Sequence, residues 1–371
     1  ALACVAGGII YVACEYLGFS AEISALLSII MVILMRTLAV KFQWCLPVLK
    51  GEGMVLLFLF YPFAASAQVN KTFDGNVRSL QVVVDDNPLL PPMLAMGKHQ
   101  HLEVSWDEMS HDYKRYIYHI QHCDAEWKPS EEIFESDYLG GLNDQLVEEY
   151  EKSFNTTQLY THYSIRFPNP QTSMLLSGNY KVQVFKEDAD VEEDAPILEA
   201  QFCLYENAAS VRMEVSSNTD IDFNRNHQQV TLGISFGTLN VVDPARELKT
   251  VVMQNRRWDN RVAGLVPNIR NSRGVEYTHN KSLIFPAGSE FHKFEILDVH
   301  RAAMGVDKME WFEPLYHATL FSKRPNQNYD YTEDQNGVFV LRSADDVDDD
   351  FTAEYVMVHF RLKSPRLAGE D

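Results

Sequence analysis

The sequence predicts a mainly β protein of tandem immunoglobulin-like β-sandwich modules, preceded by an N-terminal apolar helical segment. Short runs rich in β-branched and aromatic residues recur after residue 68, and clusters of Asn, Asp, Gly and Pro bound them. No helical periodicity separates these runs. Evenly spaced strands without intervening helices are typical of sandwiches and not of a parallel α/β sheet.

The first 67 residues differ from the rest because they are strongly apolar. Two apolar runs in residues 1–49 predict membrane helices, although each is somewhat shorter than the roughly 20 residues of a spanning helix. Residues 50–67 predict a secretory signal peptide, since the short apolar run Met54–Phe63 is followed by the small residues Ala64-Ala-Ser-Ala67. A third membrane helix is the alternative, and Pro62 counts against it.

A first module is expected over residues 68–206. Its predicted strands are 80–84, 102–106, 116–122, 163–167, 180–185 and 200–205. Residues 143–154 are the exception, because the spacing of Leu146, Val147 and Tyr150 predicts one or two helical turns.

A second module is expected over residues 207–350. Its predicted strands are 211–215, 229–235, 248–254, 282–285, 293–297, 316–321 and 338–341. The alternating run Ala353–Leu362 predicts the first strand of a third module, residues 351–371, which we expect to continue in a longer protein.

Charge and cysteine usage restrict the classes of partner. The first 67 residues hold three basic and three acidic residues, so the whole net charge of −20 belongs to the rest. Such a surface repels phosphate backbones, which argues against nucleic acid as a partner. After residue 67 only Cys123 and Cys203 remain, too few and too far apart for a zinc site; we expect two buried thiols, with a single disulfide as the alternative.

No pattern of catalytic, cofactor-binding or metal-binding residues emerges. The sequence has no G-x-G-x-x-G or G-x-x-x-x-G-K-[ST] motif. His119 and His122 fall in a predicted strand, where residues three apart point to opposite faces. We therefore expect a protein that is not an enzyme and has no cofactor.

Aromatic and amide side chains among the turns are the candidate partner-binding residues. The alternative is that they plug the ends of their own modules and bond to loop backbones. The candidates are Trp127, Tyr138, Asn143, Asn155, Tyr160, Asn255 and Trp258.

Several segments together resemble one family. They are His122–Ser130, Glu135–Asp144, Tyr150–Thr157, Tyr160–Tyr163, Ser177–Tyr180, Gln254–Trp258 and Gly288–Phe291. In order and spacing they resemble the plug protein of the type IX secretion system of Bacteroidota-type bacteria, over residues 69–371. Separately, residues 7–47 resemble the C-terminal tail of bacterial trimeric intracellular cation channels, which suggests that two neighbouring genes were read as one; a genuine membrane-tethered fusion is the alternative.

The plug resemblance implies a non-enzymatic periplasmic subunit that seals the giant outer-membrane barrel of the type IX protein transport system. That barrel is the implied partner, and the implied location is the periplasm at the outer membrane. Contact with the inner membrane is expected only through residues 1–67, if they are retained. Two alternatives stay open, a glycan-binding β-sandwich of an outer-membrane carbohydrate system and a hydrolase whose site lies beyond residue 371.

Overall fold

The computed structural model describes residues 70–224, 226–288, 291–322, 335–341 and 349–361. All of them belong to one compact unit, residues 64–371. The helices, signal peptide and channel-like segment expected in residues 1–67 lie outside the described residues. Among the residues described, no helix is long and apolar enough to cross a membrane.

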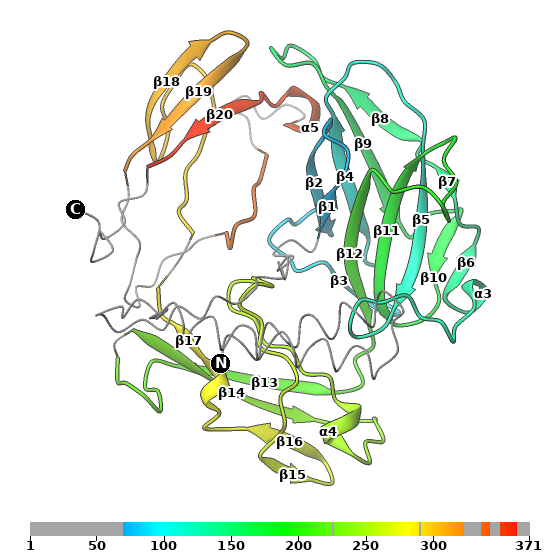
Figure 1. Ribbon diagram of the computed structural model, residues 1–371, viewed down its shortest axis with the longest axis vertical. Helices are drawn as coiled ribbons and strands as arrows, with labels where there is room; N and C mark the ends of the chain where they lie inside the picture. Colours follow the sequence, from blue (N-terminus) through cyan, green and yellow to red (C-terminus); the bar gives the residue numbers. More distant parts are fainter. Residues whose placement is uncertain (1–69, 225, 289–290, 323–334, 342–348, 362–371) are drawn as a thin grey trace, which may run out of the picture. The chain divides into compact units, whose positions relative to one another are not determined.

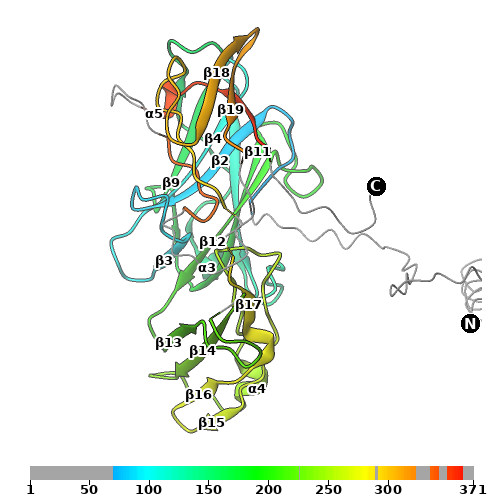
Figure 2. The same ribbon diagram turned by 90° about the vertical axis from the view of Figure 1, so that its left-hand side faces the viewer.

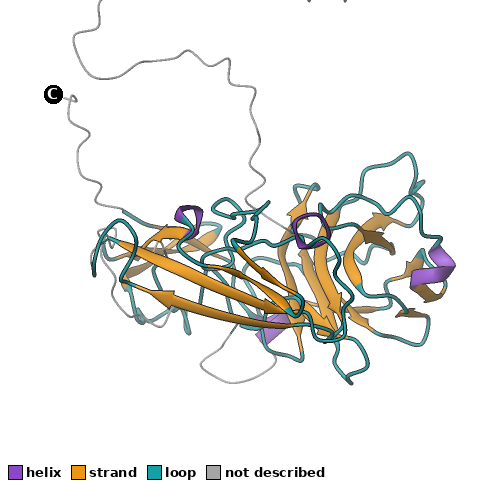
Figure 3. Ribbon diagram, turned by 90° about the horizontal axis from the view of Figure 1, so that it is seen from below, coloured by secondary structure: helices purple, strands orange, loops and turns teal. Residues whose placement is uncertain are grey.

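Strands are the main regular structure of the described chain, and the helices are single short turns (Figure 3). This confirms the mainly β class. The finer arrangement as immunoglobulin-like sandwiches stays a prediction.

Two main sheets form the part before residue 206 (Figure 1). One is antiparallel and has the order β2 (Val77–Val84), β4 (Leu102–Glu108), β9 (Thr161–Phe167), β8 (Glu149–Lys152). The other has the order β1 (Lys71–Thr72), β12 (Leu198–Tyr205), β11 (Gly178–Lys186), β5 (Tyr116–Cys123), β7 (Gln145–Leu146), with β3 (Met93–Ala95) parallel to β12. A short pair, β6 (Leu139–Gly141) and β10 (Thr172–Met174), follows the helical turn α3 (Glu135–Tyr138).

Alternation along these strands builds one core. On β5 the burial pattern alternates between buried and half-buried residues, and β4 and β9 contribute Trp106 and Tyr163, both fully buried. Their rings stack with centroids 5.5 Å apart, and Tyr116 meets both edge-on. Fully burying one large apolar side chain contributes about 1.5–3 kcal/mol, so alternation of this kind selects which face turns inward.

The helical turns predicted for residues 143–154 are wrong. The segment forms two edge strands, β7 on β5 and β8 on β9. Helical spacing of three apolar residues is only a weak local preference. Pairing with the edges of β5 and β9 outweighs it, so the segment is extended.

A second set of strands forms a five-stranded sheet (Figure 2). Its order is β13 (Ser210–Ser216), β14 (His227–Ser235), β16 (Gly274–Tyr277), β15 (Ile269–Asn271), and β17 (Ile284–Pro286) also pairs with β14. Val230, Leu232, Val275 and Tyr277 supply much of its buried core. The helical turn α4 (Pro244–Glu247) and the 3₁₀ turn η1 (Lys281–Leu283) complete it.

Three strands predicted after residue 247 are wrong. Residues 248–254 form only an isolated bridge between Val252 and Val262. Residues 293–297 and 338–341 are not strands either, and together they line a hollow of about 460 Å³. Within the described residues, no strand pairs with either segment.

The last sheet consists of β18 (Val306–Phe312), β19 (Leu315–Leu320) and β20 (Val356–His359). β18 and β19 form a hairpin, and β20 pairs in parallel with β19. The strand expected within residues 353–362 is therefore present, and it has β19 as its partner. The helical turn α5 (Asp349–Thr352) precedes it.

The two cysteines lie on strands that flank β11. Both Cys123 on β5 and Cys203 on β12 are in register with Asn179. Two strand spacings separate them by about 10 Å, beyond the roughly 7 Å between Cα atoms that a disulfide spans. The disulfide alternative is wrong, and the thiols are free, Cys123 buried and Cys203 half-buried.

Candidate functional site at Trp127 and Trp258

Trp127 lies in a tight turn that follows β5. The Asp124 carboxylate accepts hydrogen bonds from the backbone N–H groups of Glu126 (2.8 Å) and Lys128 (2.9 Å). The Asp124 N–H closes the turn onto the carbonyl of Lys128. Trp127 has a φ of 63°, a left-handed conformation that is uncommon for a bulky residue. The Asp side chain thus holds a strained turn that presents the indole.

Trp258 lies in the loop between Val252 and Val262, which two backbone hydrogen bonds of 2.8–2.9 Å close. Within it Asn255 and Arg256 both have positive φ values, 52° and 58°. The guanidinium of Arg257 donates to the Asp259 carboxylate, and this hydrogen bond lowers the pKa of Asp259. The loop is therefore fixed by its own side chains.

The two loops meet through their indoles. The rings of Trp127 and Trp258 are edge to face, with centroids 6.1 Å apart and planes at 78°. Arg261 places its guanidinium 5.6 Å from the Trp258 centroid and donates to the Trp258 carbonyl. Such an aromatic pair contributes about 0.5–1.5 kcal/mol beyond its buried area, and an exposed cation–π contact about 0.5–1 kcal/mol.

Charged side chains add further contacts around the Trp127 and Trp258 loops. Lys249 forms an ion pair with Glu126 at 3.3 Å. The guanidinium of Arg256 donates to the carbonyls of Leu89 and Leu90, and burial lowers its pKa. Trp127 and Trp258 remain half-buried, so part of each ring faces solvent. The arrangement has the aromatic and arginine content of protein-binding surfaces.

Tyr138 and Asn143 serve their own fold. Tyr138 is buried beside His122 and Tyr180. Asn143 accepts from the N–H of Ile120 (2.7 Å) and donates to its carbonyl (2.9 Å), as a neighbouring strand would. For Tyr138 and Asn143 the contacts therefore agree with the alternative interpretation, in which the side chain stabilises its own module.

Asn155 and Tyr160 lie beside the C-terminal segment of this same chain. Tyr160 is buried, donates to the carbonyl of Ala353 at 3.0 Å, and its ring meets Tyr355 edge-on. Asn155 is exposed in a turn with a φ of 59°. Of the seven candidates, only Trp127, Trp258 and the nearby Asn255 come together at one surface.

Sequence reasoning missed a polar network under Tyr355. Its hydroxyl donates to Asp107 (2.6 Å) and contacts Ser79 (2.7 Å), while His162 contacts the other oxygen of Asp107 (2.7 Å). A β-bulge in β2 between Arg78 and Gln81 places Ser79 at φ 53°. No local signal marks this network, because its members lie in four separate segments.

The histidines are likewise used structurally. His119 contacts Asp144 at 2.8 Å, whereas His122 contacts Ser130 and the carbonyl of Ser177. In the part of the chain that the structure describes, no three His, Cys, Asp or Glu side chains are grouped to hold a metal ion.

Comparison with known proteins relates part of the chain to a known domain family. Residues 77–206 match the family model described as "Type 9 secretion system plug protein 1st domain". The crystal structure of a hypothetical protein from Parabacteroides merdae, at 2.30 Å resolution, is 32% identical with a TM-score of 0.75. The match covers 81% of this chain and 75% of that one. Residues 77–206 are thus similar to the first domain of type 9 secretion system plug proteins.

The plug-domain match confirms part of the sequence-based resemblance. It associates the protein with the type 9 secretion machinery of the cell envelope, and the family is not a known enzyme family. No match to this chain was found among curated proteins. The resemblance of residues 7–47 to a cation channel stays a prediction.

Proposed function

We propose that this protein is a non-enzymatic periplasmic subunit that seals the outer-membrane translocon of the type 9 secretion system. The observation that carries the proposal is the plug-domain match over residues 77–206. A pore that passes folded cargo would leak small solutes when idle, so a body that caps it reversibly has a clear physical use. Capping requires binding alone, with no covalent bond made or broken.

The features of the chain are compatible with reversible capping. Its β-sheets hold loops on a rigid scaffold, which is how binding loops are commonly presented. We propose that the loops of Trp127 and Trp258 contact the barrel. Their half-buried indoles, with Arg261 beside the Trp258 ring, suit a polar interface of modest size that forms and dissociates.

Affinity purification of the full chain from native outer membrane tests the proposal. We expect a giant barrel to co-purify and to be lost with Arg261→Ala, while Arg301→Ala, at an equally charged and exposed arginine outside both loops, retains it. A strain lacking the protein should admit large hydrophilic dyes through the outer membrane. Recovery of a glycan without any barrel would reject the proposal in favour of the carbohydrate-binding alternative.

A further inference from the structure

β13 forms one end of the five-stranded sheet. Over its seven residues it pairs with β14, from Ser210 opposite Ser235 to Ser216 opposite Gln229. On its other side no strand within the described ranges pairs with it. Alternate N–H and C=O groups of β13 therefore face outward, as at any open strand edge.

This edge strand carries an apolar row that the sheet does not cover. Val211, Met213 and Val215 are 65%, 61% and 51% exposed. They share a face with the core, since the residue opposite Met213 is the buried Leu232 and the residue opposite Val215 is the buried Val230. The apolar face of the sheet thus continues out to the open edge.

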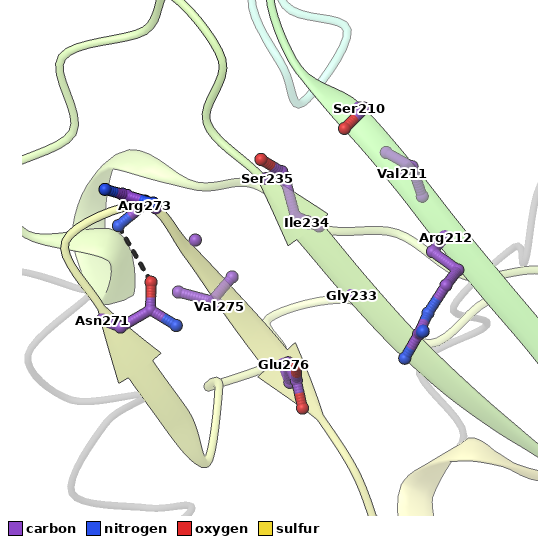
Figure 4. Close-up of a pocket in the computed structure, with 11 residues that line it drawn as sticks. Ser210, Val211, Arg212, Gly233, Ile234, Ser235, Asn271, Arg273, Val275 and Glu276 are labelled. Carbon is purple, nitrogen blue, oxygen red and sulfur yellow. Dashed lines mark hydrogen bonds between the residues drawn. The ribbon is translucent and has the colours of Figure 1, made fainter.

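The opposite face of β13 carries two opposite charges, Arg212 and Glu214. Arg212 stands opposite Gly233 and Glu214 opposite Thr231. Figure 4 shows Arg212 extending beside Gly233, where the absent side chain helps to form a hollow of about 340 Å³. Neither Arg212 nor Glu214 forms an ion pair with any residue that the structure describes.

The sequence of β13 is symmetric about Met213. Ser210-Val-Arg-Met-Glu-Val-Ser216 reads the same in both directions, except that Arg212 mirrors Glu214. In an antiparallel pair of two such strands centred on Met213, each Val211 faces a Val215 and each Arg212 faces a Glu214. The two-fold pairing therefore creates two Arg212–Glu214 ion pairs. On the other face, the apolar side chains of the two strands form one continuous row.

We propose that two copies of this chain associate through β13, antiparallel about a two-fold axis at Met213, to form one continuous sheet. A two-fold interface must be self-complementary, and the mirrored Arg and Glu satisfy that condition. Strand addition uses the open backbone groups for affinity and the side chains for register. One pair of seven-residue strands is small beside the roughly 1,200–2,000 Å² of stable complexes, so the dimer is expected to be reversible.

Cysteine cross-linking of the full chain tests this pairing. In every variant Cys4, Cys14 and Cys45 are changed to serine so that they cannot cross-link. Met213→Cys should give a disulfide-linked dimer on mild oxidation, because residues directly opposite across the axis have Cβ atoms about 4.5–5.5 Å apart. Met304→Cys, at a methionine of comparable exposure (49%), is the control and should stay monomeric.

Charge exchange tests the register in the Met213→Cys background. Arg212→Glu or Glu214→Arg alone replaces two attractive pairs by two repulsive ones, and we expect about a tenfold loss of dimer. The double variant restores opposite charges and should restore the dimer. Cross-linking no greater than in the Met304→Cys control would overturn the proposal, as would a double variant as weak as the single ones.

A cross-link from position 213 to a different protein would also overturn the proposal, since the edge would then receive a foreign strand. The inference does not depend on the proposed plugging function. Dimer yield is measured without the translocon, so each proposal can fail while the other stands.

Discussion

The hydroxyl of Tyr355 donates a 2.6 Å hydrogen bond to the carboxylate of Asp107, 248 positions earlier in the chain. Nearby, Glu354 accepts hydrogen bonds from the N–H and hydroxyl of Thr157. Together with the bond from Tyr160 to Ala353, these contacts fasten residues 353–355 onto β4 and onto the loop that precedes β9. Burial and the Asp107 charge raise the pKa of Tyr355, so the phenol stays a donor.

Removing the Tyr355 hydroxyl is expected to weaken this attachment. A hydrogen bond to a charged group contributes about 1.5–3 kcal/mol, and Asp107 keeps its contact with His162, so Tyr355→Phe should lower the free energy of unfolding by about 1–2 kcal/mol. Urea denaturation followed by tryptophan fluorescence measures it. Tyr205→Phe, at an exposed tyrosine, is the control and should change stability by less than about 0.5 kcal/mol. Equal effects of the two changes would contradict this role.

The Trp127–Trp258 contact predicts energetic coupling between the two loops. Single alanine substitutions and the double substitution form a thermodynamic cycle, in which we expect a coupling free energy of about 0.5–1.5 kcal/mol. Urea denaturation of the four proteins gives the value. Additivity of the two single effects would show that the rings contribute independently.

Asn143 is predicted to act as a substitute strand partner for Ile120. Asn143→Ala removes an acceptor from the Ile120 N–H and a donor from its carbonyl, so unfolding should become easier by about 1–3 kcal/mol. Asn143→Asp keeps the acceptor but loses the donor, and it should also destabilise. Asn76→Ala, at an exposed asparagine, provides the comparison. If thermal unfolding of Asn143→Ala matches that of Asn76→Ala, the bridging role is wrong.

The two free thiols are expected to react slowly in the folded protein. Burial raises the pKa of both Cys123 and Cys203 to about 11. Little thiolate exists at pH 8, and the alkylation rate should climb steeply between pH 8 and 11. Mass spectrometry after iodoacetamide treatment, with and without urea, resolves each cysteine.

The same shift sets the direction of a pH effect on stability. The pKa of each thiol is higher in the folded protein than in the unfolded chain. The free energy of unfolding is therefore unaffected by the thiols below about pH 9, and it falls as the pH rises toward 11, because the unfolded chain loses its thiol protons first. Rapid labelling of the folded protein at pH 8 would contradict the assigned burial.

The sequence by itself determined the strands whose alternation is local. The run from Tyr116 to Cys123 alternates between core and surface, and any chain path that buries one face makes it a strand. The same reasoning failed for residues 143–154 and 248–254. There the local patterns were weak, and the presence or absence of a neighbouring strand edge decided the outcome.

The candidate site shows the same division. Sequence reasoning selected Trp127 and Trp258 by residue type, because aromatic residues among turns are available for contacts. Only the tertiary structure brought their indoles within 6.1 Å, buried Tyr138 and Tyr160, and joined Tyr355 to Asp107. Side-chain periodicity is a property of a few consecutive residues, whereas a contact across more than a hundred positions depends on the path of the whole chain between them.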